Sequence, residues 1–270
     1  DLGGELDQVF AEFDTQPLAA ASMAQVYRAR LLSGEAVVVK VQRPGLRRQM
    51  TADLQLLESL AQLIEQNEAL ALYQPRQLVR QLARAMLEEL DFTQEGQNCD
   101  IVAQNFAQTP HIVIPAIYWA FCSQRLLVQA FVPSYTPLSR DPLIAQGLDP
   151  SLLAKRGAQA FIKMLLEDGL FHGDPHPGNL RAMSDNRVGF IDFGMVGRLD
   201  ERRRLEVMNF MRALTEGSTE TLIGVLIDWS GERVQDLSLI EQAAREYMAR
   251  QTGGPLKMSA LITDFLGLIR

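Results

Sequence analysis

The sequence predicts an α+β fold of two parts, with mixed strands and helices up to about Val132 and mainly helices after it. Three observations predict this fold class. Two β-type runs, residues 24–32 and 36–41, flank the turn pair Ser33-Gly34 and are typical of a hairpin. Two amphipathic helical patterns follow the hairpin. Helical spacing then dominates the chain from Ser151 onward, interrupted by one polar stretch and a short strand.

Composition narrows the class of protein. A chain of 270 residues, 47% of them hydrophobic, is long enough for one large domain or two lobes. The formal net charge of −7 argues against nucleic acid as the main partner, because binding to a phosphate backbone needs a basic face. With only Cys99 and Cys122 we expect no disulfide framework, and we expect a reducing compartment.

No apolar run reaches the length of a bilayer span, and residues 221–229, the nearest to one, are far too few. The chain begins at Asp1 without a methionine or an apolar leader, so we expect a piece of a longer protein. Any targeting element or membrane anchor would then lie outside this piece.

Helical and strand patterns can be assigned along the first part. Residues 6–13 have helical spacing and are followed by Pro17, which predicts a helix that ends before this proline. After the hairpin, Thr51 is expected to cap one helix, and Pro75 to lie in the first turn of a second. The apolar positions of the second helix that we expect to be buried are Leu78, Val79, Leu82, Met86 and Leu90.

Both strands and helices are expected further along the chain. Short strands are expected at residues 111–114 and 125–132, followed by a long helix over residues 151–169. Asp185-Asn186 predicts a turn before a strand at residues 188–192. The remaining helical patterns are residues 201–214, 219–229, 237–250 and 257–268.

The polar stretch after the long helix carries the strongest chemical signal. Residues 171–179 read Phe-His-Gly-Asp-Pro-His-Pro-Gly-Asn, and residues 191–194 read Ile-Asp-Phe-Gly. Asp174, Asn179 and Asp192 therefore follow the order of a kinase catalytic loop and its Asp-Phe-Gly metal site. In this interpretation Asn179 and Asp192 hold Mg²⁺, and Asp174 orients or deprotonates a nucleophile.

Lys40 can supply the positive charge that phosphoryl chemistry needs. It follows three valines on an apolar strand, whose end is expected to carry the ammonium group into the cleft between the two parts. A surface lysine that closes a strand is an equally simple interpretation of Lys40 alone.

The alternation of His172, Asp174 and His176 permits a different site, a hydrolase whose imidazole nitrogens bind zinc or iron. Pro175 and Pro177 argue against this alternative, because they force a turn-rich loop in place of a regular strand. The chain also has only three histidines.

The glycine-rich lid that covers the phosphates in ordinary kinases is missing. Residues 17–26 read Pro-Leu-Ala-Ala-Ala-Ser-Met-Ala-Gln-Val in its place. Alanine resists the positive φ angles and the close backbone approach that glycine allows. On its own, this segment is read more simply as a tight loop of small residues.

Together these motifs resemble the UbiB family of atypical kinases, the aarF-type or ABC1-type proteins of bacteria, mitochondria and plastids. The resemblance covers residues 2–217. The segments that carry it are the alanine-rich loop, Val38-Val-Lys-Val-Gln-Arg-Pro-Gly, Glu89-Leu-Asp-Phe-Thr-Gln-Glu-Gly-Gln-Asn98, residues 171–179 and Asp192-Phe-Gly-Met.

The resemblance implies a protein kinase-like, two-lobed fold, with a mixed N-lobe at residues 1–132, a mainly helical C-lobe at residues 133–270 and extra helices. It implies that ATP and Mg²⁺ bind, and that the phosphate loop is formed by Ala19, Ala20, Ala21 and Ser22. It also implies an ATPase or small-molecule kinase that supports isoprenoid quinone metabolism. The partners then expected are a nucleotide and a lipid- or quinone-related substrate, with peripheral contact to the cytoplasmic or organellar side of a membrane.

By the same resemblance, Glu89 and Asp91 form a Glu-x-Asp motif near the nucleotide, and Glu95 pairs with Lys40. Spacing alone nominates Glu58, because an ordinary kinase carries this partner on the first helix after the lysine strand. The resemblance favours Glu95.

The sequence departs from the family pattern in three places. The family's Lys-x-Gly-Gln motif, which precedes the kinase core, is absent from residues 1–270. Gln129 stands where the family often has glutamate, so adenine contacts at Val128, Gln129 and Phe131 are expected through the backbone. No Ala-Pro-Glu element follows Gly194, which argues against a protein substrate.

Two other functions stay open from the sequence. A nucleotide-binding regulator without turnover would need all of these residues except Asp174. An ordinary protein kinase is disfavoured by the alanine-rich loop and by the missing docking element.

Overall fold

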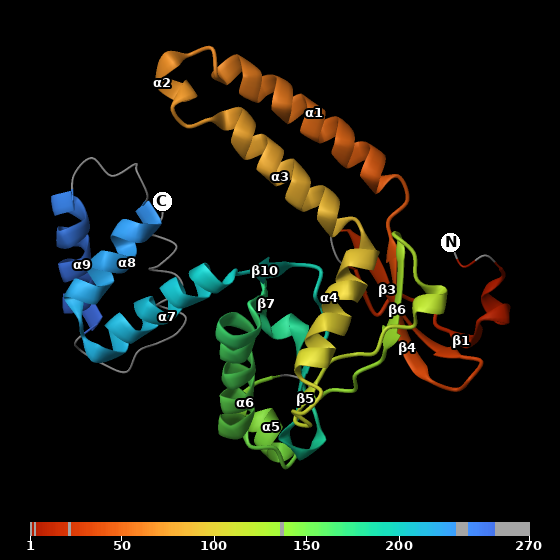
Figure 1. Ribbon diagram of the computed structural model, residues 1–270. Coiled ribbons are helices and arrows are strands. Elements are labelled where there is room, and N and C mark those ends of the chain that lie inside the picture. Colours follow the sequence, from red (N-terminus) through yellow and green to blue (C-terminus); the bar gives the residue numbers. More distant parts are fainter. Residues whose placement is uncertain (1, 3, 21–22, 136–137, 231–236, 252–270) are drawn as a thin grey trace. The chain divides into compact units, whose positions relative to one another are not determined.

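The computed structural model describes all residues except 1, 3, 21–22, 136–137, 231–236 and 252–270 (Figure 1). The chain divides into two compact units. One consists of Asp1–Met164 and Leu170–Gly197, and the other of Leu165–Gly169 and Arg198–Arg270. The lobe boundary expected at Val132 lies within the first unit and stays a prediction. The helix predicted over residues 257–268 lies outside the described residues.

An antiparallel sheet begins the first unit. Its strands lie in the order β1, β3, β4 and β6, and β2 pairs with β3. The bounds are Phe10–Phe13 for β1, Ala19–Ala20 for β2, Ala24–Leu31 for β3, Ala36–Gln42 for β4 and Leu126–Ala130 for β6. Strands β3 and β4 form the predicted hairpin. Val39 and Val128 are buried in one cluster and Leu127 in another, as expected for side chains on opposite faces of a sheet.

The helix predicted over residues 6–13 is wrong. A single 3-10 turn, Leu6–Gln8, is followed by strand β1. The pairing of β1 with β3 shifts register between Phe10 and Glu12, and the ring centroids of Phe10 and Phe13 lie 5.4 Å apart. Because a bulge places residues three positions apart on the same face of a strand, the sequence imitates helical spacing.

Two helices form an antiparallel hairpin after β4 (Figure 1). They are α1, Leu46–Ile64, and α3, Pro75–Glu89, with the short α2, Glu68–Ala71, between them. Helix α1 begins earlier than predicted, after Gly45 with its φ of 73°. The hydroxyl of Thr51 donates to the carbonyl of Arg47 inside the helix and does not cap it. Pro75 lies in the first turn of α3, as predicted.

Part of the buried stripe expected on α3 is exposed. Leu90, directly after the helix, is buried with Met50 and Leu54 of α1. Leu78 and Leu82, however, are 57% and 47% exposed. Helix α1 covers only one face of α3, so an apolar stripe wider than that face is not buried by α1 alone.

Helix α4, Phe92–Asn105, has no counterpart among the predicted elements. Asp91 caps it, because its Oδ1 accepts hydrogen bonds from the backbone N–H of Thr93 at 3.0 Å and from the Thr93 hydroxyl at 2.6 Å. An aspartate at this position followed by Glu95 in the first turn is a helix-start signal. The polar run around Gly96 obscures the apolar spacing that would otherwise have indicated a helix.

A second, three-stranded sheet has the order β5, β9 and β8. The bounds are Ile112–Val113 for β5, Val188–Phe190 for β9 and Leu180–Ala182 for β8. Strand β7, Leu170–His172, pairs with β10, Val196–Arg198. Asp185 and Asn186 have φ angles of 59° and 55°, which confirms the turn predicted before β9.

Helices α5 and α6 complete the first unit. They span Arg140–Ala145 and Pro150–Lys163, and a π-helical turn, Met164–Asp168, follows α6. Gly169 ends this segment with a φ of 67°, close to the predicted end. Met164, Phe190 and Phe193 are buried in one cluster.

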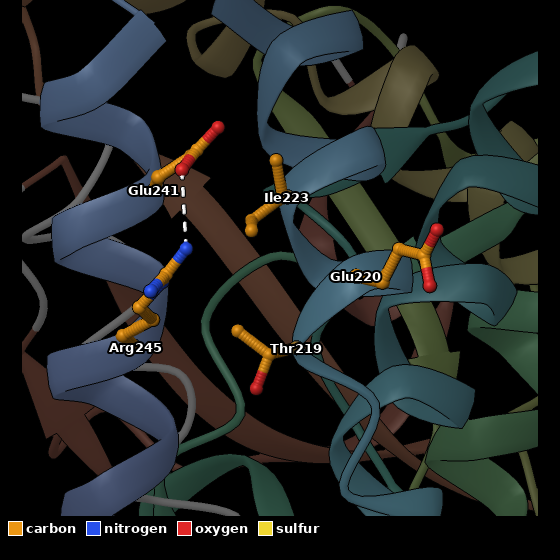
Figure 2. A pocket seen from close by; sticks show the side chains of 5 residues that line it. All are labelled: Thr219, Glu220, Ile223, Glu241 and Arg245. Carbon is orange, nitrogen blue, oxygen red and sulfur yellow. Dashed lines mark hydrogen bonds and ion pairs between the residues drawn. The ribbon is translucent and has the colours of Figure 1, made fainter.

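Three helices follow in the second unit. They are α7, Glu201–Glu216, α8, Thr219–Ser230, and α9, Leu237–Gln251, in the predicted order. Phe210, Leu222 and Ala244 are buried between them. A surface pocket of about 520 Å³ is lined by Thr219, Glu220, Ile223, Glu241 and Arg245 (Figure 2). None of the site residues predicted from the sequence lies there. Among the described residues, no helix is long and apolar enough to cross a membrane.

Candidate functional site

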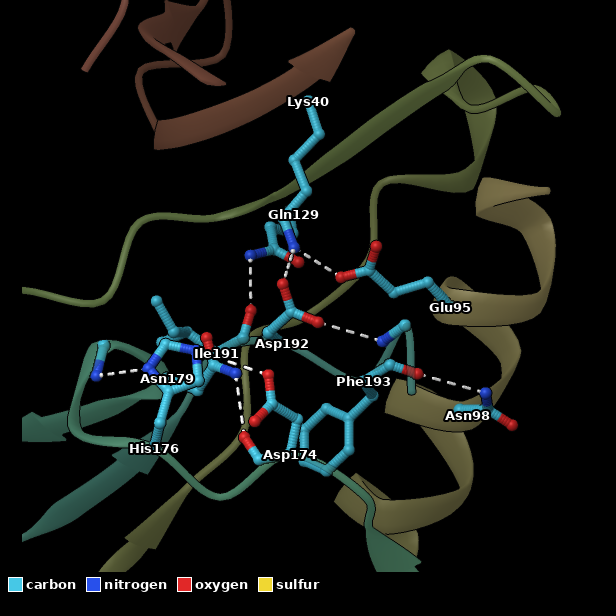
Figure 3. A network of polar contacts seen from close by, with 12 residues as sticks. Lys40, Glu95, Asn98, Gln129, Asp174, His176, Asn179, Ile191, Asp192 and Phe193 are labelled. Atoms are coloured by element: carbon cyan, nitrogen blue, oxygen red, sulfur yellow. Dashed lines mark hydrogen bonds and ion pairs between the residues drawn. The ribbon is translucent and has the colours of Figure 1, made fainter. Parts of the chain in front are cut away.

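Lys40 on β4 is almost fully buried, with 7% of its surface exposed. Its Nζ contacts Oε1 of Glu95 and lies 3.0 Å from Oδ2 of Asp192 (Figure 3). Strand β4, helix α4 and the segment after β9 therefore meet at one ammonium group. The interpretation of Lys40 as a surface lysine is wrong, because both of its contacts and its burial place it inside the first unit.

Glu95 lies in the first turn of α4 and is buried. Glu58 of α1 instead pairs with Arg80 of α3, with 3.2 Å between Oε1 and Nε. The structure thus pairs Lys40 with the glutamate favoured by the resemblance. Spacing along the chain nominates Glu58 wrongly, because α1 packs against α3 in a hairpin of its own. Helix α4, which carries Glu95, contacts β6 of the sheet instead.

Charge and burial oppose each other in this group. Burial alone would lower the pKa of Lys40, but Glu95 and Asp192 outweigh it and hold that pKa above its usual value. Burial raises the pKa of Glu95 against the attraction of Lys40. Burial would also raise the pKa of Asp192, but the charge of Lys40 and the N–H of Gly194 outweigh it and lower that pKa. The charged forms of Lys40 and Asp192 are thus the ones that this geometry stabilises.

Backbone hydrogen bonds place Asp192 beside Asn179. The N–H of Ile191 donates to the carbonyl of Asn179 at 3.1 Å, next to the pairing of β8 with β9. The N–H of Gly194 donates to Oδ1 of Asp192 at 3.0 Å. The two residues predicted to hold a metal are therefore brought together by the backbone of two neighbouring segments.

Two buried amide side chains hold the backbone on either side of Asp192, at Ile191 and at Phe193, and neither role was predicted. Nδ2 of Asn98, on α4, donates to the carbonyl of Phe193 at 3.1 Å. Nε2 of Gln129, on β6, donates to the carbonyl of Ile191 at 3.1 Å. No local sequence signal indicates these contacts, because each joins positions more than sixty residues apart.

The loop that carries Asp174 is also fixed from within. His172 is buried, and its Nδ1 accepts a hydrogen bond from the N–H of Asp174 at 3.1 Å. Burial lowers the pKa of His172 against the charges of Asp192 and Asp174. Nδ2 of Asn179 donates to the carbonyl of Asp174 at 3.1 Å. The carboxylate of Asp174 is exposed, so it is accessible to a reactant.

The donor atoms fit Mg²⁺ better than zinc or iron. Asp192 and Asn179 offer carboxylate and amide oxygens, the ligands that Mg²⁺ takes beside phosphate oxygens and water. Nδ1 of His172 and Nδ1 of His176 both accept backbone N–H groups, at 3.1 and 3.0 Å. Within the described part of the chain, no group of three His, Cys, Asp or Glu side chains is arranged to hold a metal ion. The imidazole-based hydrolase site therefore has no support in this geometry.

Glu89 and Asp91 lie at the junction of α3 and α4 and differ in their surroundings. Burial raises the pKa of Glu89, and the charges of Asp192 and Asp174 add to this effect. Glu89 therefore belongs to the same electronegative region as the predicted metal ligands. The carboxylate of Asp91 caps α4, and its Oδ2 lies 3.5 Å from Nε2 of Gln124.

The predicted nucleotide-binding segments are only partly described. Ala19 and Ala20 form β2, which pairs with Val26 and Gln25 of β3, whereas Ala21 and Ser22 lie outside the described residues. On the joining segment, the carbonyl of Val128 accepts from Tyr118 and the N–H of Phe131 donates to Ala36, both at 2.9 Å. The side chain of Gln129 is bound to Ile191. An adenine contact at these residues stays a prediction.

The chain matches a known family over most of its length. Residues 1–226 match the model of the ABC1 atypical kinase-like domain. In structure, the chain is similar to a Mycobacterium tuberculosis protein solved in complex with erythromycin, with a TM-score of 0.60 and 22% identity. That similarity covers 95% of this chain and 69% of the other. At this identity it supports the kinase-like fold alone.

Two curated proteins show the extent of the similarity. An uncharacterised Synechocystis protein is 40% identical over 200 residues, which cover 74% of this chain and 35% of the relative. The Arabidopsis thaliana protein named ACTIVITY OF BC1 COMPLEX KINASE 7, chloroplastic, is 31% identical over 249 residues, 92% of this chain and 36% of that protein. The chain thus spans about a third of the length of these relatives.

Proposed function

Because the chain belongs to the family of ABC1 atypical kinase-like domains, we propose that it binds ATP with Mg²⁺ and transfers or hydrolyses the terminal phosphoryl group. The observation that carries this proposal is the contact of one buried ammonium group, that of Lys40, with both Glu95 and Asp192. Protein kinases need a lysine on a strand, its glutamate partner and the Asp-Phe-Gly aspartate in place together for phosphoryl transfer.

Each residue has a distinct part in this proposal. Mg²⁺, held by Asp192 and Asn179, would neutralise the charge that develops on the phosphate oxygens. Lys40 contacts the phosphates, and Glu95 holds its ammonium group in the site. Asp174 orients a hydroxyl group or a water and accepts its proton, since its carboxylate is exposed and its backbone carbonyl accepts a hydrogen bond from Asn179.

The proposed acceptor is water or a small lipid- or quinone-related molecule. Between Gly194 and the start of α7, three residues form β10, which pairs with β7. The segment between Gly194 and α7 is therefore short, and half of it forms a strand. This leaves little room for docking a peptide. Peripheral attachment to a membrane surface belongs to the same proposal, since it would bring the site to such an acceptor.

Phosphate release from ATP by the purified chain tests this function. We expect Mg²⁺-dependent release that rises with lipid vesicles or with phenols that resemble quinone precursors. Asp174→Asn should remove the release and keep ATP-induced thermal stabilisation, whereas Asp141→Asn, an exposed aspartate of α5, should change neither.

The outcomes separate the alternatives. ATP-induced stabilisation without phosphate release under any of these conditions would indicate a nucleotide-binding regulator. Phosphorylation of a generic peptide at the rates of ordinary kinases would indicate a protein kinase.

A further inference from the structure

His176 lies in the loop of Asp174, and its backbone is held by a proline on each side. Pro175 and Pro177 lock their own φ angles and offer no N–H groups. His176 caps the 3-10 turn Pro177–Asn179, because its Nδ1 accepts a hydrogen bond from the N–H of Gly178 at 3.0 Å. Since Nδ1 is the acceptor, the proton of the neutral ring lies on Nε2.

This Nε2 faces Asp174. It lies 3.5 Å from Oδ2 of the Asp174 carboxylate (Figure 3). This distance is longer than an ordinary N–H···O hydrogen bond, so the two groups are in close contact without a formed hydrogen bond. Hydrogen bonds of catalytic groups often tighten only when the reactants bind. An N–H on one carboxylate oxygen restricts rotation of the carboxylate and leaves the other oxygen to accept a proton.

Gly178 provides the space that the imidazole ring occupies. A Cβ atom on Gly178 would lie 2.4 Å from Cε1 and 2.7 Å from Nδ1 of His176. Gly178 is not among the glycines with positive φ, so its backbone conformation is open to other residues. The ring of His176, and not the backbone, accounts for the glycine at this position.

We propose that His176 is a positioning residue that holds the carboxylate of Asp174, and that Gly178 is required for His176 to do so. The role rests on the function proposed above for Asp174. His172 and Asn179 bind the backbone of Asp174 from the same loop, at 3.1 Å each, whereas His176 faces its side chain. The backbone and the carboxylate of Asp174 are thus positioned by different residues.

Two conservative variants separate the contacts of the ring. Gln in place of His176 can keep an N–H donor near the position of Nε2, and Asn can keep an acceptor near the position of Nδ1. We expect His176→Asn and His176→Ala to lower kcat for phosphate release by about 10- to 100-fold, because a misplaced reacting group costs rate on this scale. His176→Gln should recover most of the rate, and the KM for ATP should change in none of the three variants.

Gly178→Ala tests the space for the ring. It should lower kcat as His176→Ala does, and the double variant should be no slower than either single variant, because both changes disturb one contact. Losses that multiply in the double variant would overturn the role of Gly178. A wild-type rate in His176→Asn, or a KM for ATP raised in step with the fall in kcat, would overturn the role of His176.

Ring nitrogen chemical shifts provide a readout without turnover. The chain has three histidines, so single substitutions can assign their resonances. We expect the Nε2–H form for neutral His176 in the wild type, and a changed Nε2 chemical shift in Asp174→Ala.

The outcomes separate the two proposals. The Nδ1–H form of His176 would overturn the proposed geometry. If wild-type protein shows the Nε2–H form but releases no phosphate, the proposed function fails, and the positioning role fails with it. If it releases phosphate and His176→Asn does so equally, only the role of His176 is overturned.

Discussion

Lys40 and Asp192 lie 152 positions apart in the sequence, yet Nζ of Lys40 lies 3.0 Å from Oδ2 of Asp192. The same ammonium group contacts Glu95 on α4. A buried charge is costly unless it is paired, so Glu95 and the partly exposed Asp192 make the burial of Lys40 tolerable, and Lys40 does the same for Glu95. The arrangement therefore bears on stability as well as on the proposed chemistry.

Lys40→Met should lower the rate of phosphate release by at least about 100-fold, since it removes the charge aimed at the phosphates. It should also lower the free energy of unfolding by about 3 kcal/mol, because Glu95 is left buried and unpaired. Urea denaturation of Lys40→Met and of the double variant Lys40→Met/Glu95→Gln measures this cost. The double variant should recover part of the lost stability. Lys155→Met, at an exposed position of α6, serves as the control. Equal stability of wild type and Lys40→Met would contradict the pairing.

Asp192→Asn should remove the Mg²⁺-dependent part of ATP-induced thermal stabilisation. The amide keeps an oxygen that can accept from the N–H of Gly194, so the fold should be retained. Melting curves with ATP, with and without Mg²⁺, make the measurement, and chelation of Mg²⁺ from wild-type protein should reproduce the effect. An unchanged ATP-induced shift in the variant would rule out Asp192 as a metal ligand.

Glu95→Gln and Glu58→Gln form a matched pair. Glu95→Gln should weaken nucleotide binding, since it loosens the ammonium group of Lys40. Glu58→Gln breaks an exposed pair with Arg80, so it should change stability by less than about 1 kcal/mol and leave nucleotide binding unchanged. Titration of both variants with ATP measures their affinities for the nucleotide. Weakened binding in Glu58→Gln, with unchanged binding in Glu95→Gln, would reinstate Glu58 as the functional partner of Lys40.

Asn98→Ala should loosen the Asp-Phe-Gly segment. Loss of the donor to the buried carbonyl of Phe193 should cost about 1–3 kcal/mol of stability and lower phosphate release. Gln97→Ala, at the exposed neighbouring position of the same helix, should affect neither property. Chemical denaturation and phosphate release, measured on both variants, show whether the effect belongs to the buried amide.

The sequence determined the local parts of this protein. The β3–β4 hairpin, the start of α3, the turn at Asp185-Asn186 and the order of α7, α8 and α9 are visible because turn residues, prolines and helical spacing act over a few positions. The polar loop of Asp174 and the Asp-Phe-Gly segment are visible for the same reason, since each carries its chemistry in consecutive residues. With the other motifs, they also made the family recognisable.

Local spacing did not decide which distant residues meet, and the family resemblance anticipated one such pair, Lys40 and Glu95. The tertiary structure brings the distant residues together. It placed α4, and not the first helix after the lysine strand, beside Lys40, and it assigned Asn98 and Gln129 to the backbone of the Asp-Phe-Gly segment. Pairing with β3, with a bulge in the register, makes residues 10–13 a strand and not a helix. The packing of the helices also leaves Leu78 and Leu82 exposed. These outcomes depend on which helix faces and strand edges pack together. The spacing of residues along one segment does not indicate which other segment will pack against it.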